Sequence, residues 1–453
     1  FLHDHFTLFF IAPFVGHALY VVIRLFGFRD KTNKRTMTCE WTNALGFAIV
    51  AASIIRSLFF EAFTIPTGSM EKTMRIGDYL FVNKMKYGAK LPQTPISIPF
   101  VHNRIPLTFI PSFVDWFSSD YHRLFGYGEI KRNDIMVFNW PVGDSVIVHN
   151  GVIAHDYYAI LRNQAFINYF EFVKNKKEFK GKPLFFYKNN YLKVENKYLN
   201  SARNQLVQGG GLSQSPVGPI AKTGGIATLP IDKKENYIKR CVAVGGDTLQ
   251  IINNVLHING EPEEEKDEVV FTYNFYFKPG SYIPHEKIAE EYEIYKDQHQ
   301  RAKIDNKVIQ VLDTSFKDSL VYKDQLVAFS QEQITCSPQT ARMLSRYPGL
   351  DSMSQEIHPQ GFDYTLYGQY YPYFPNHRDF NWSRDNYGPL FIPKLGSTIE
   401  LNDKNWIIYK RAIEVYEQNT ISKTADGKFF INNKEQTSYT FKQNYYWLMG
   451  DNR

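Results

Sequence analysis

The sequence predicts a mainly β protein in which two amino-terminal transmembrane helices precede an antiparallel β-sheet domain with large insertions. Two observations carry this prediction. Aromatic residues make up 16% of the 453 residues, with 30 Tyr and 36 Phe, and such a composition favours strands. Two apolar stretches lie close to the start of the chain, one on each side of a basic segment.

The first apolar stretch, residues 6–23, carries no formal charge and has about the minimum length of a spanning helix. The second, residues 41–60, is apolar from 44 to 55, and Arg56 near its end can extend toward the interface. Residues 24–35 between them hold five Lys or Arg and one Asp, which predicts a cytoplasmic loop. A secretory signal peptide, the competing interpretation, does not fit two spans around a basic loop.

Composition excludes several classes of function. The formal charge is +6, but no long Lys/Arg run coincides with a nucleic-acid-binding motif, so no nucleic-acid partner is expected. Three scattered cysteines, Cys39, Cys241 and Cys336, are too few for a disulfide framework or a four-ligand zinc site. No phosphate-binding loop stands at a strand-to-helix junction, and no cofactor or metal is expected.

One candidate nucleophile follows the second apolar stretch. Residues 66–69 read PTGS, and a strand-like run, residues 78–82, comes soon after. Ser69 directly follows Gly68, and a small residue at that place lets a substrate backbone approach a nucleophile on a turn. Taken alone, a serine in such a turn is more often structural.

One candidate base lies in an apolar, β-branched run, residues 235–251. Period-two alternation places Lys239 on one face and Arg240 on the opposite face. A lysine held against apolar neighbours has a lowered pKa and acts as a neutral base, which a serine without a histidine needs. The alternative is an edge-strand lysine that discourages sheet-to-sheet pairing.

Four ordered blocks resemble the bacterial type I signal peptidases. The serine block, residues 66–74, reads PTGSMEKTM before Gly77 and Asp78, with Lys72 in place of the family's proline. The second block, residues 132–141, reads RNDIMVFNWP and departs from the family pattern at Asn133 and Met136. The lysine block, residues 237–247, reads YIKRCVAVGGD, with Gly245 in place of a proline, and the last block, residues 450–453, reads GDNR.

The resemblance implies a Ser/Lys endopeptidase that acts through an acyl-enzyme. Ser69 would be the nucleophile and Lys239 the general base, and the Ser69 N–H with the Thr67 hydroxyl would form the oxyanion hole. The supporting residues implied by the blocks are Gly68, Met70, Arg240, Asp451, Asn452 and Arg453. The implied partners are exported preproteins with small residues at −3 and −1, and membrane lipid. The implied location is the bacterial cytoplasmic membrane, with the catalytic domain on the extracytoplasmic or periplasmic side.

The last block stops at Arg453, and the family's orienting serine and aspartate would follow that position. We therefore expect the dyad to be held less firmly in residues 1–453 than in a longer chain, and activity to be impaired.

Two alternatives remain open at this point. Residues 69–72 also fit S-x-x-K, and residues 222–224 fit K-T-G, the first and last motifs of penicillin-binding proteins; residues 187–189 resemble the middle one. That fold needs a helix from Ser69 onward and a strand at K-T-G, whereas a strand-like run follows Ser69 and residues 208–219 look like a linker. A membrane-tethered binding module without catalysis is the second alternative.

The predicted organisation has eight parts. They are a first transmembrane helix (6–28), a basic loop (29–40), a second transmembrane helix (41–63), a catalytic β core with the serine block (64–150), an insertion (151–227), core with the lysine block (228–262), an insertion or cap (263–391) and a truncated final part of the core (392–453). Hairpins are predicted at 246–262 and 426–441, a strand at 392–401 and a surface helix at 285–300.

Overall fold

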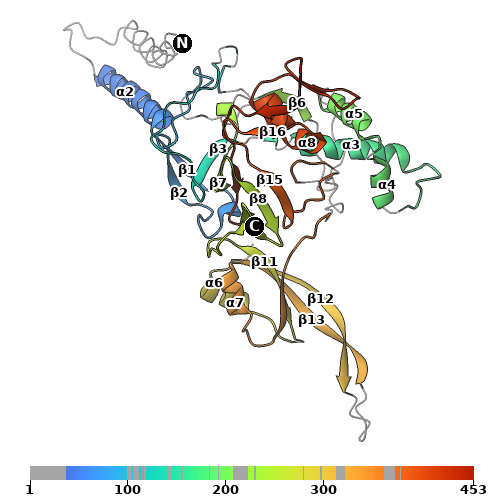
Figure 1. The fold of residues 1–453 in the computed structure, drawn as a ribbon. Helices are drawn as coiled ribbons and strands as arrows, with labels where there is room; N and C mark the ends of the chain where they lie inside the picture. Colours follow the sequence, from blue (N-terminus) through green and yellow to red (C-terminus); the bar gives the residue numbers. More distant parts are fainter. Residues whose placement is uncertain are drawn as a thin grey trace.

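The fold is built around small antiparallel sheets with two lobes attached (Figure 1). The computed structural model describes residues 37–453 apart from single residues, short stretches and the longer segments 106–111, 140–144, 208–222, 313–321 and 362–372. All pairings between its named strands are antiparallel. The predicted transmembrane helix 6–28 and most of the basic loop lie outside the described residues.

Strand β7 (Asn236–Ala243) is the centre of the arrangement. It pairs with β3 (Ile135–Asn139) along its length and with β21 (Trp447–Met449) at its C-terminal half. Its end enters the largest apolar core together with β8 (Thr248–Ile252) and β15 (Tyr387–Phe391). The neighbouring elements in order are β9 (Val255–Ile258), β10 (Glu261–Pro262), β16 (Thr398–Glu400), α8 (Asp403–Arg411), β17 (Ile421–Lys423), β18 (Phe429–Ile431), β19 (Lys434–Gln436) and β20 (Ser438–Thr440).

Two lobes flank this core in Figure 1. One contains helices, α3 (Tyr157–Val173), α4 (Leu184–Tyr191) and α5 (Glu195–Val207), beside the strands β4 (Ser145–His149), β5 (Val152–Ala154) and β6 (Thr223–Thr228). The other is a four-stranded sheet in the order β12 (His299–Leu312), β13 (Tyr322–Cys336), β11 (Phe271–Phe277), β14 (Leu350–Gln355), covered by α6 (His285–Tyr292) and α7 (Pro338–Leu344). The long hairpin β12–β13 projects away from the core.

The prediction of a mainly β fold is wrong. Helix and strand occur in nearly equal amounts, 26% and 28%. The error arises from the aromatic residues, because Phe166, Tyr169, Phe170 and Val173 recur at helical spacing and pack with Tyr191 in the core of the helical lobe. Aromatic content alone does not distinguish a strand from a buried helix face.

The predicted second transmembrane helix, residues 41–63, is also not found. Among the described residues, no helix combines the length and the apolar character needed to cross a bilayer. Helix α2 (Met37–Leu58) ends before Phe60, where strand β1 (Phe60–Thr64) begins, and Arg56 pairs with Glu61 at 2.8 Å. The apolar run 44–55 spans about 18 Å as a helix, against a hydrocarbon core of about 30 Å.

Several local predictions are confirmed. Strands β8 and β9 form the hairpin predicted at 246–262, and β18 and β19 form the one at 426–441. Asn253 and Asn254 turn the first hairpin with positive φ, and Asn432 and Asn433 turn the second, as Asn-rich two-residue turns do. The helix predicted at 285–300 ends at Tyr292, where Glu293 adopts a left-handed conformation, and only Thr398–Glu400 of the strand predicted at 392–401 is extended in a sheet.

Candidate active site

Ser69 lies on a single 3-10 turn, Gly68–Met70, that leaves strand β1. Thr67 before it is extended, with φ −140° and ψ 151°. The Met70 side chain is completely buried and fixes the turn to the interior. A Cβ on Gly68 would come within 2.4 Å of the Glu71 carboxylate, so the small residue leaves room for that side chain. The result is a half-buried serine on a short, anchored turn.

No helix continues from Ser69 through Lys72. Lys72 has φ 71°, in the left-handed region, so it cannot extend a right-handed helix. Strand β2 (Tyr79–Asn83) then begins. The proline that the family has at this position, whose ring holds φ near −65°, would not fit this backbone. The one-turn relation between serine and lysine that penicillin-binding proteins require is therefore not formed here.

The predicted linker, residues 208–219, lies outside the described residues, but K-T-G beside it lies in part on a strand. Lys222 lies outside the described residues, and Thr223–Thr228 forms β6, which pairs with β4. Pairing with a neighbouring strand outweighs the low strand propensity of Gly224 and Gly225. The argument against the penicillin-binding-protein alternative therefore rests on the serine segment alone.

Lys239 reaches Ser69 from strand β7. Its Nζ lies 2.5 Å from Ser69 Oγ and 3.0 Å from the Ile238 carbonyl oxygen. Met136 on β3 is its cross-strand partner. Burial lowers the pKa of the Lys239 ammonium, while the charge of Asp451 opposes that change. A lysine with a lowered pKa, in hydrogen-bond contact with a serine hydroxyl, can act as a general base.

Thr67 and Ser69 also lie beside each other. Thr67 Oγ1 is 3.5 Å from Ser69 Oγ, at the limit of a hydrogen bond. A hydroxyl at this place is within reach of a group that reacts at Ser69. The site residues predicted from the serine and lysine blocks thus meet at one point, although 170 residues separate Lys239 from Ser69.

Arg240 points away from the dyad, into a buried ion pair with Asp451. Its Nε and Nη2 donate to the two Asp451 carboxylate oxygens at 2.8 and 2.7 Å, and Asp451 is 0% exposed. Thr73 Oγ1 donates to Asp451 at 2.5 Å and accepts from Arg240 Nη2 at 3.2 Å. Burial opposes ionisation of Asp451, but the hydrogen bonds from Arg240 and Thr73 leave its pKa lowered.

The rest of the last block lies against the serine turn. The Asn452 N–H donates to the Ser69 carbonyl at 3.4 Å, and Asn452 Nδ2 donates to the Gly68 carbonyl at 3.4 Å. A Cβ on Gly450 would come within 2.4 Å of the Ser69 carbonyl oxygen, so this approach requires glycine. Arg453 forms an ion pair with Glu263 at 2.9 Å. Gly450 and Asn452 therefore contact the serine turn directly, whereas Arg453 is paired with Glu263.

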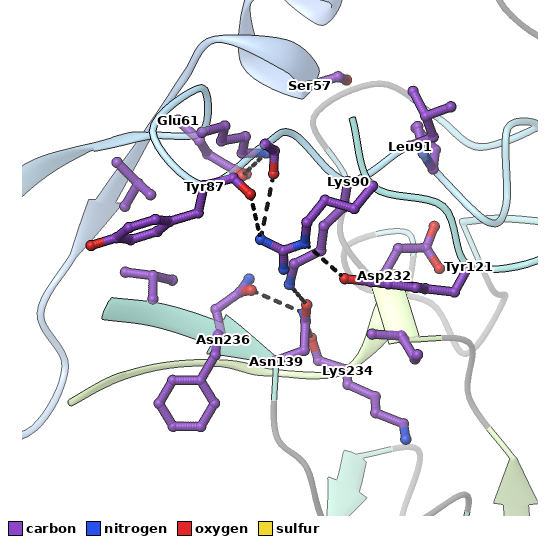
Figure 2. A pocket seen from close by; sticks show the side chains of 18 of the residues that line it. Ser57, Glu61, Tyr87, Lys90, Leu91, Tyr121, Asn139, Asp232, Lys234 and Asn236 are labelled. Atoms are coloured by element: carbon purple, nitrogen blue, oxygen red, sulfur yellow. Dashed lines mark hydrogen bonds and ion pairs between the residues drawn. The ribbon is translucent and has the colours of Figure 1, made fainter. Parts of the chain in front are cut away.

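A large cleft of about 2660 Å³ opens beside the dyad. Phe63, Met74 and Ile238 line it, whereas Ser69 and Lys239 do not. The dyad therefore lies at the margin of the cleft. Figure 2 shows polar side chains that line part of the cleft, with Lys90 and Asn139 pointing toward each other.

Thr73 and the group around Lys90 could not be identified from the sequence. Thr73 lies inside the serine block, and its position four residues after Ser69 was the only signal of a role. Lys90 and the residues around it come from a segment without a recognisable pattern, because their relation to β3 and β7 exists only in three dimensions.

Comparison with known proteins agrees with this arrangement. A family model described as signal peptidase, peptidase S26, matches residues 38–167 and 212–330. Signal peptidase I of Pseudomonas aeruginosa is 29% identical over 112 residues, 25% of this chain and 30% of its own length. Signal peptidase I of Rickettsia rickettsii is 37% identical over 118 residues, 26% of this chain and 37% of its own length. Signal peptidase I of Haemophilus influenzae is 47% identical over 53 residues, which are 12% of this chain and 15% of its own length.

The chain spans about a third or less of the length of these curated relatives. The family model, in contrast, covers more than half of the chain, including the serine and lysine blocks. The chain therefore belongs to the signal peptidase family, the S26 peptidases.

Proposed function

We propose that this protein is a serine endopeptidase that removes N-terminal signal peptides from exported preproteins. The observation that carries this proposal is the 2.5 Å separation between Lys239 Nζ and Ser69 Oγ. The relatives named signal peptidase I support the substrate class. Small residues at −3 and −1 of the cleavage site are part of the proposal.

The proposed reaction passes through an acyl-enzyme. Neutral Lys239 accepts the Ser69 hydroxyl proton while Ser69 Oγ attacks the scissile carbonyl carbon. The negative oxygen of the tetrahedral intermediate accepts hydrogen bonds from the Ser69 N–H and the Thr67 hydroxyl, and one such donor typically contributes roughly 3 kcal/mol. Lys239 then gives its proton to the leaving amine. Neutral again, it activates the water that hydrolyses the ester.

The first test removes the base. We expect Lys239→Ala to lower the cleavage rate of a peptide with Ala at −3 and −1 by about 10²–10⁴-fold, the usual contribution of a positioned general base. Lys72→Ala is the matched control, because it removes a lysine three residues from Ser69 and should leave the rate unchanged. Equal losses in both variants, or activity retained in Lys239→Ala, would contradict the proposal.

The second test uses pH. Only neutral Lys239 can accept the proton, so kcat/KM should rise with pH through the lowered pKa of this group. The charge of Asp451 raises that pKa, so Asp451→Asn should move the acid limb of the profile to lower pH. The position of the limb, and not the maximal rate, is the readout, because loss of the buried carboxylate also affects stability. Asp403→Asn, at an exposed site, should leave the acid limb in place. If Asp451→Asn moved the acid limb to higher pH, the assignment of Lys239 as general base would be refuted.

Substrate would bind as an added strand between β1 and β7. Among the strands that the structure describes, β1 pairs with β2 alone, and β21 covers the C-terminal half of β7 but not its N-terminal half. The Ile65 N–H donates to the Asp78 carbonyl, so the backbone N–H and C=O groups of Ile65 point toward the β2 side. By alternation along the strand, the backbone N–H and C=O groups of Ala62 and Thr64 point toward the free edge.

The third test blocks that edge. Ala62→Pro removes an N–H that faces away from β2, so we expect a rise in KM for an extended peptide while the β1–β2 pair is kept. Ala62→Ser, which keeps the N–H, should behave like the wild type. An unchanged KM in Ala62→Pro would mean that the substrate does not pair with β1.

We also propose that cleavage takes place at the extracytoplasmic face of the bacterial cytoplasmic membrane, with lipid against the β1–β2 pair. The register places Ala62 opposite Phe81 and Thr64 opposite Tyr79. Tyr79 is 84% and Phe81 78% exposed, and Phe60 is exposed on the same face. Exposed aromatic side chains gathered on one face are typical of an interaction surface.

The fourth test concerns this surface. We expect the double substitution Tyr79→Ser and Phe81→Ser to weaken flotation with phospholipid vesicles and to spare cleavage of a soluble peptide. Phe172→Ser removes an exposed aromatic side chain from α3 in the helical lobe, and it should bind vesicles like the wild type. If both variants floated alike, the β1–β2 face would not be the lipid contact.

A further inference from the structure

The cleft beside the dyad is strongly positive. Of the side chains that line it, nine are Lys or Arg and four are Asp or Glu. The cations are Arg56, Lys84, Lys86, Lys90, Arg123, Lys233, Lys234, Lys394 and Arg411, and the acids are Glu61, Asp120, Glu129 and Asp232. Such a surplus of one sign in a cleft concentrates ligands of the opposite sign.

Two of these cations are held side by side. Lys90 and Arg123 are partners in an antiparallel β-bridge. Lys90 Nζ donates to the Asn139 amide oxygen at 2.5 Å. Arg123 donates to the Tyr121 hydroxyl at 3.1 Å and to the Tyr87 carbonyl at 3.2 Å. All these acceptors are neutral, and within the described part of the chain neither cation has an ion pair with a carboxylate.

The carboxylate whose charge acts on Lys90 is already engaged. Glu61 pairs with Arg56 at 2.8 Å and with Lys84 at 2.7 Å. Burial, then the charges of Arg123 and Lys84, lower the pKa of Lys90 to about 8, and Glu61 opposes them only as the smallest contribution. A half-buried cation next to a second cation is electrostatically unfavourable, and a bound anion would relieve this.

The position of this pair relative to the dyad restricts the ligand. Asn139, which accepts from Lys90, lies opposite Asn236 on β7. Asn236 is three residues from Lys239, about 10 Å along a strand. Ile238, next to the catalytic lysine, lines the same cleft as Lys90. A distance of this order corresponds to about three to five residues of an extended peptide, which sets the positions at which a substrate side chain in the cleft would meet Lys90.

We propose that Lys90 and Arg123 form a subsite for a carboxylate side chain of the preprotein, which gives this peptidase a preference for an acidic residue several positions from the cleavage site. The proposal rests on the proposed peptidase function. Figure 2 shows the arrangement on which it depends, with Lys90, Asn139 and Asn236 close together in the cleft. The positive charge of the pair and the continuity of the cleft favour a segment of the substrate as the source of the carboxylate.

The experiment compares peptides that share Ala at −3 and −1 and differ at one position. Glu, Gln or Lys is placed in turn at each of the positions three to six residues on either side of the scissile bond. We expect one position at which Glu lowers KM about five- to tenfold relative to Gln, with kcat unchanged, as for a charge-assisted contact made before the reaction. Lys should raise KM at the same position.

Variants at Lys90 assign the effect. Lys90→Met should abolish the difference between Glu and Gln, and Lys90→Glu should reverse it so that the Lys peptide becomes the better substrate. Lys90→Arg should keep the preference. Lys410→Met, at an exposed lysine of α8, is the matched control and should behave like the wild type. Thermal unfolding of each variant separates a lost contact from a lost fold.

The pH dependence adds an independent check. Lys90 loses its charge as pH rises through about 8, so the preference for Glu should fade above that pH in the wild type. Arg keeps its charge there, so Lys90→Arg should retain the preference at pH 9. The charged groups that act on Lys90 are Arg123, Lys84 and Glu61. Burial opposes ionisation of Glu61, but its pairs with Lys84 and Arg56 leave its pKa lowered, so its carboxylate stays charged over this range.

The outcomes separate the two proposals. If wild-type protein cleaves the Gln peptides but shows no preference for Glu at any position, the carboxylate subsite is refuted and the peptidase function stands. If Lys90→Met instead loses binding to phosphatidylglycerol vesicles, or inhibition by inorganic phosphate, without a change in peptide preference, the cations serve a phosphate ligand and the proposal is also refuted. If no peptide is cleaved, the peptidase function itself fails.

Discussion

The buried ion pair between Arg240 and Asp451 is the interaction on which the rest of the site depends. It joins three segments that are far apart in the sequence, because Thr73 from the serine block bonds to both partners. Removing one member of such a pair leaves an uncompensated buried charge, which typically costs about 3–5 kcal/mol. The pair therefore fixes β7, the last block and the serine block relative to one another.

Two adjacent lysine-block residues show how burial acts differently on paired and unpaired cations. Arg240 has a bidentate carboxylate, which raises its pKa despite burial. Lys239 is one residue away on the opposite face of the same strand. Its hydrogen-bond partners within the described residues are a hydroxyl and a carbonyl, and burial lowers its pKa. Strand alternation thus places a permanent charge on one side and a potential neutral base on the other.

Sequence reasoning identified the segments of the site but not the interactions between them. Ser69, Lys239 and Asp451 each lie in a block with a recognisable pattern, and the order of the blocks linked them. Thr73 had no separate signal, and Lys90 none at all, because its partners Asn139 and Arg123 lie 49 and 33 positions away in the chain. The fold class failed for a different reason: Phe166 and Tyr169 have aromatic rings that suit both a strand and a buried helix face.

The sheet lobe interrupts the chain between the lysine block and the last block, yet the site remains assembled, and the backbone explains why. The Val270 N–H donates to the Asp451 carbonyl at 2.8 Å, and the Arg453 N–H donates to the Val270 carbonyl at 2.9 Å. Strand β11 of the lobe begins at the next residue, Phe271. The root of the lobe is therefore paired with the same segment that holds Arg240 and Ser69. At the other end of the lobe, Asn254 Nδ2 of the β8–β9 turn donates to the Glu356 carbonyl at 3.1 Å. Both ends are thus fixed at the core, and because the entropy cost of closing a loop grows only slowly with its length, the lobe adds little to the cost of bringing the blocks together.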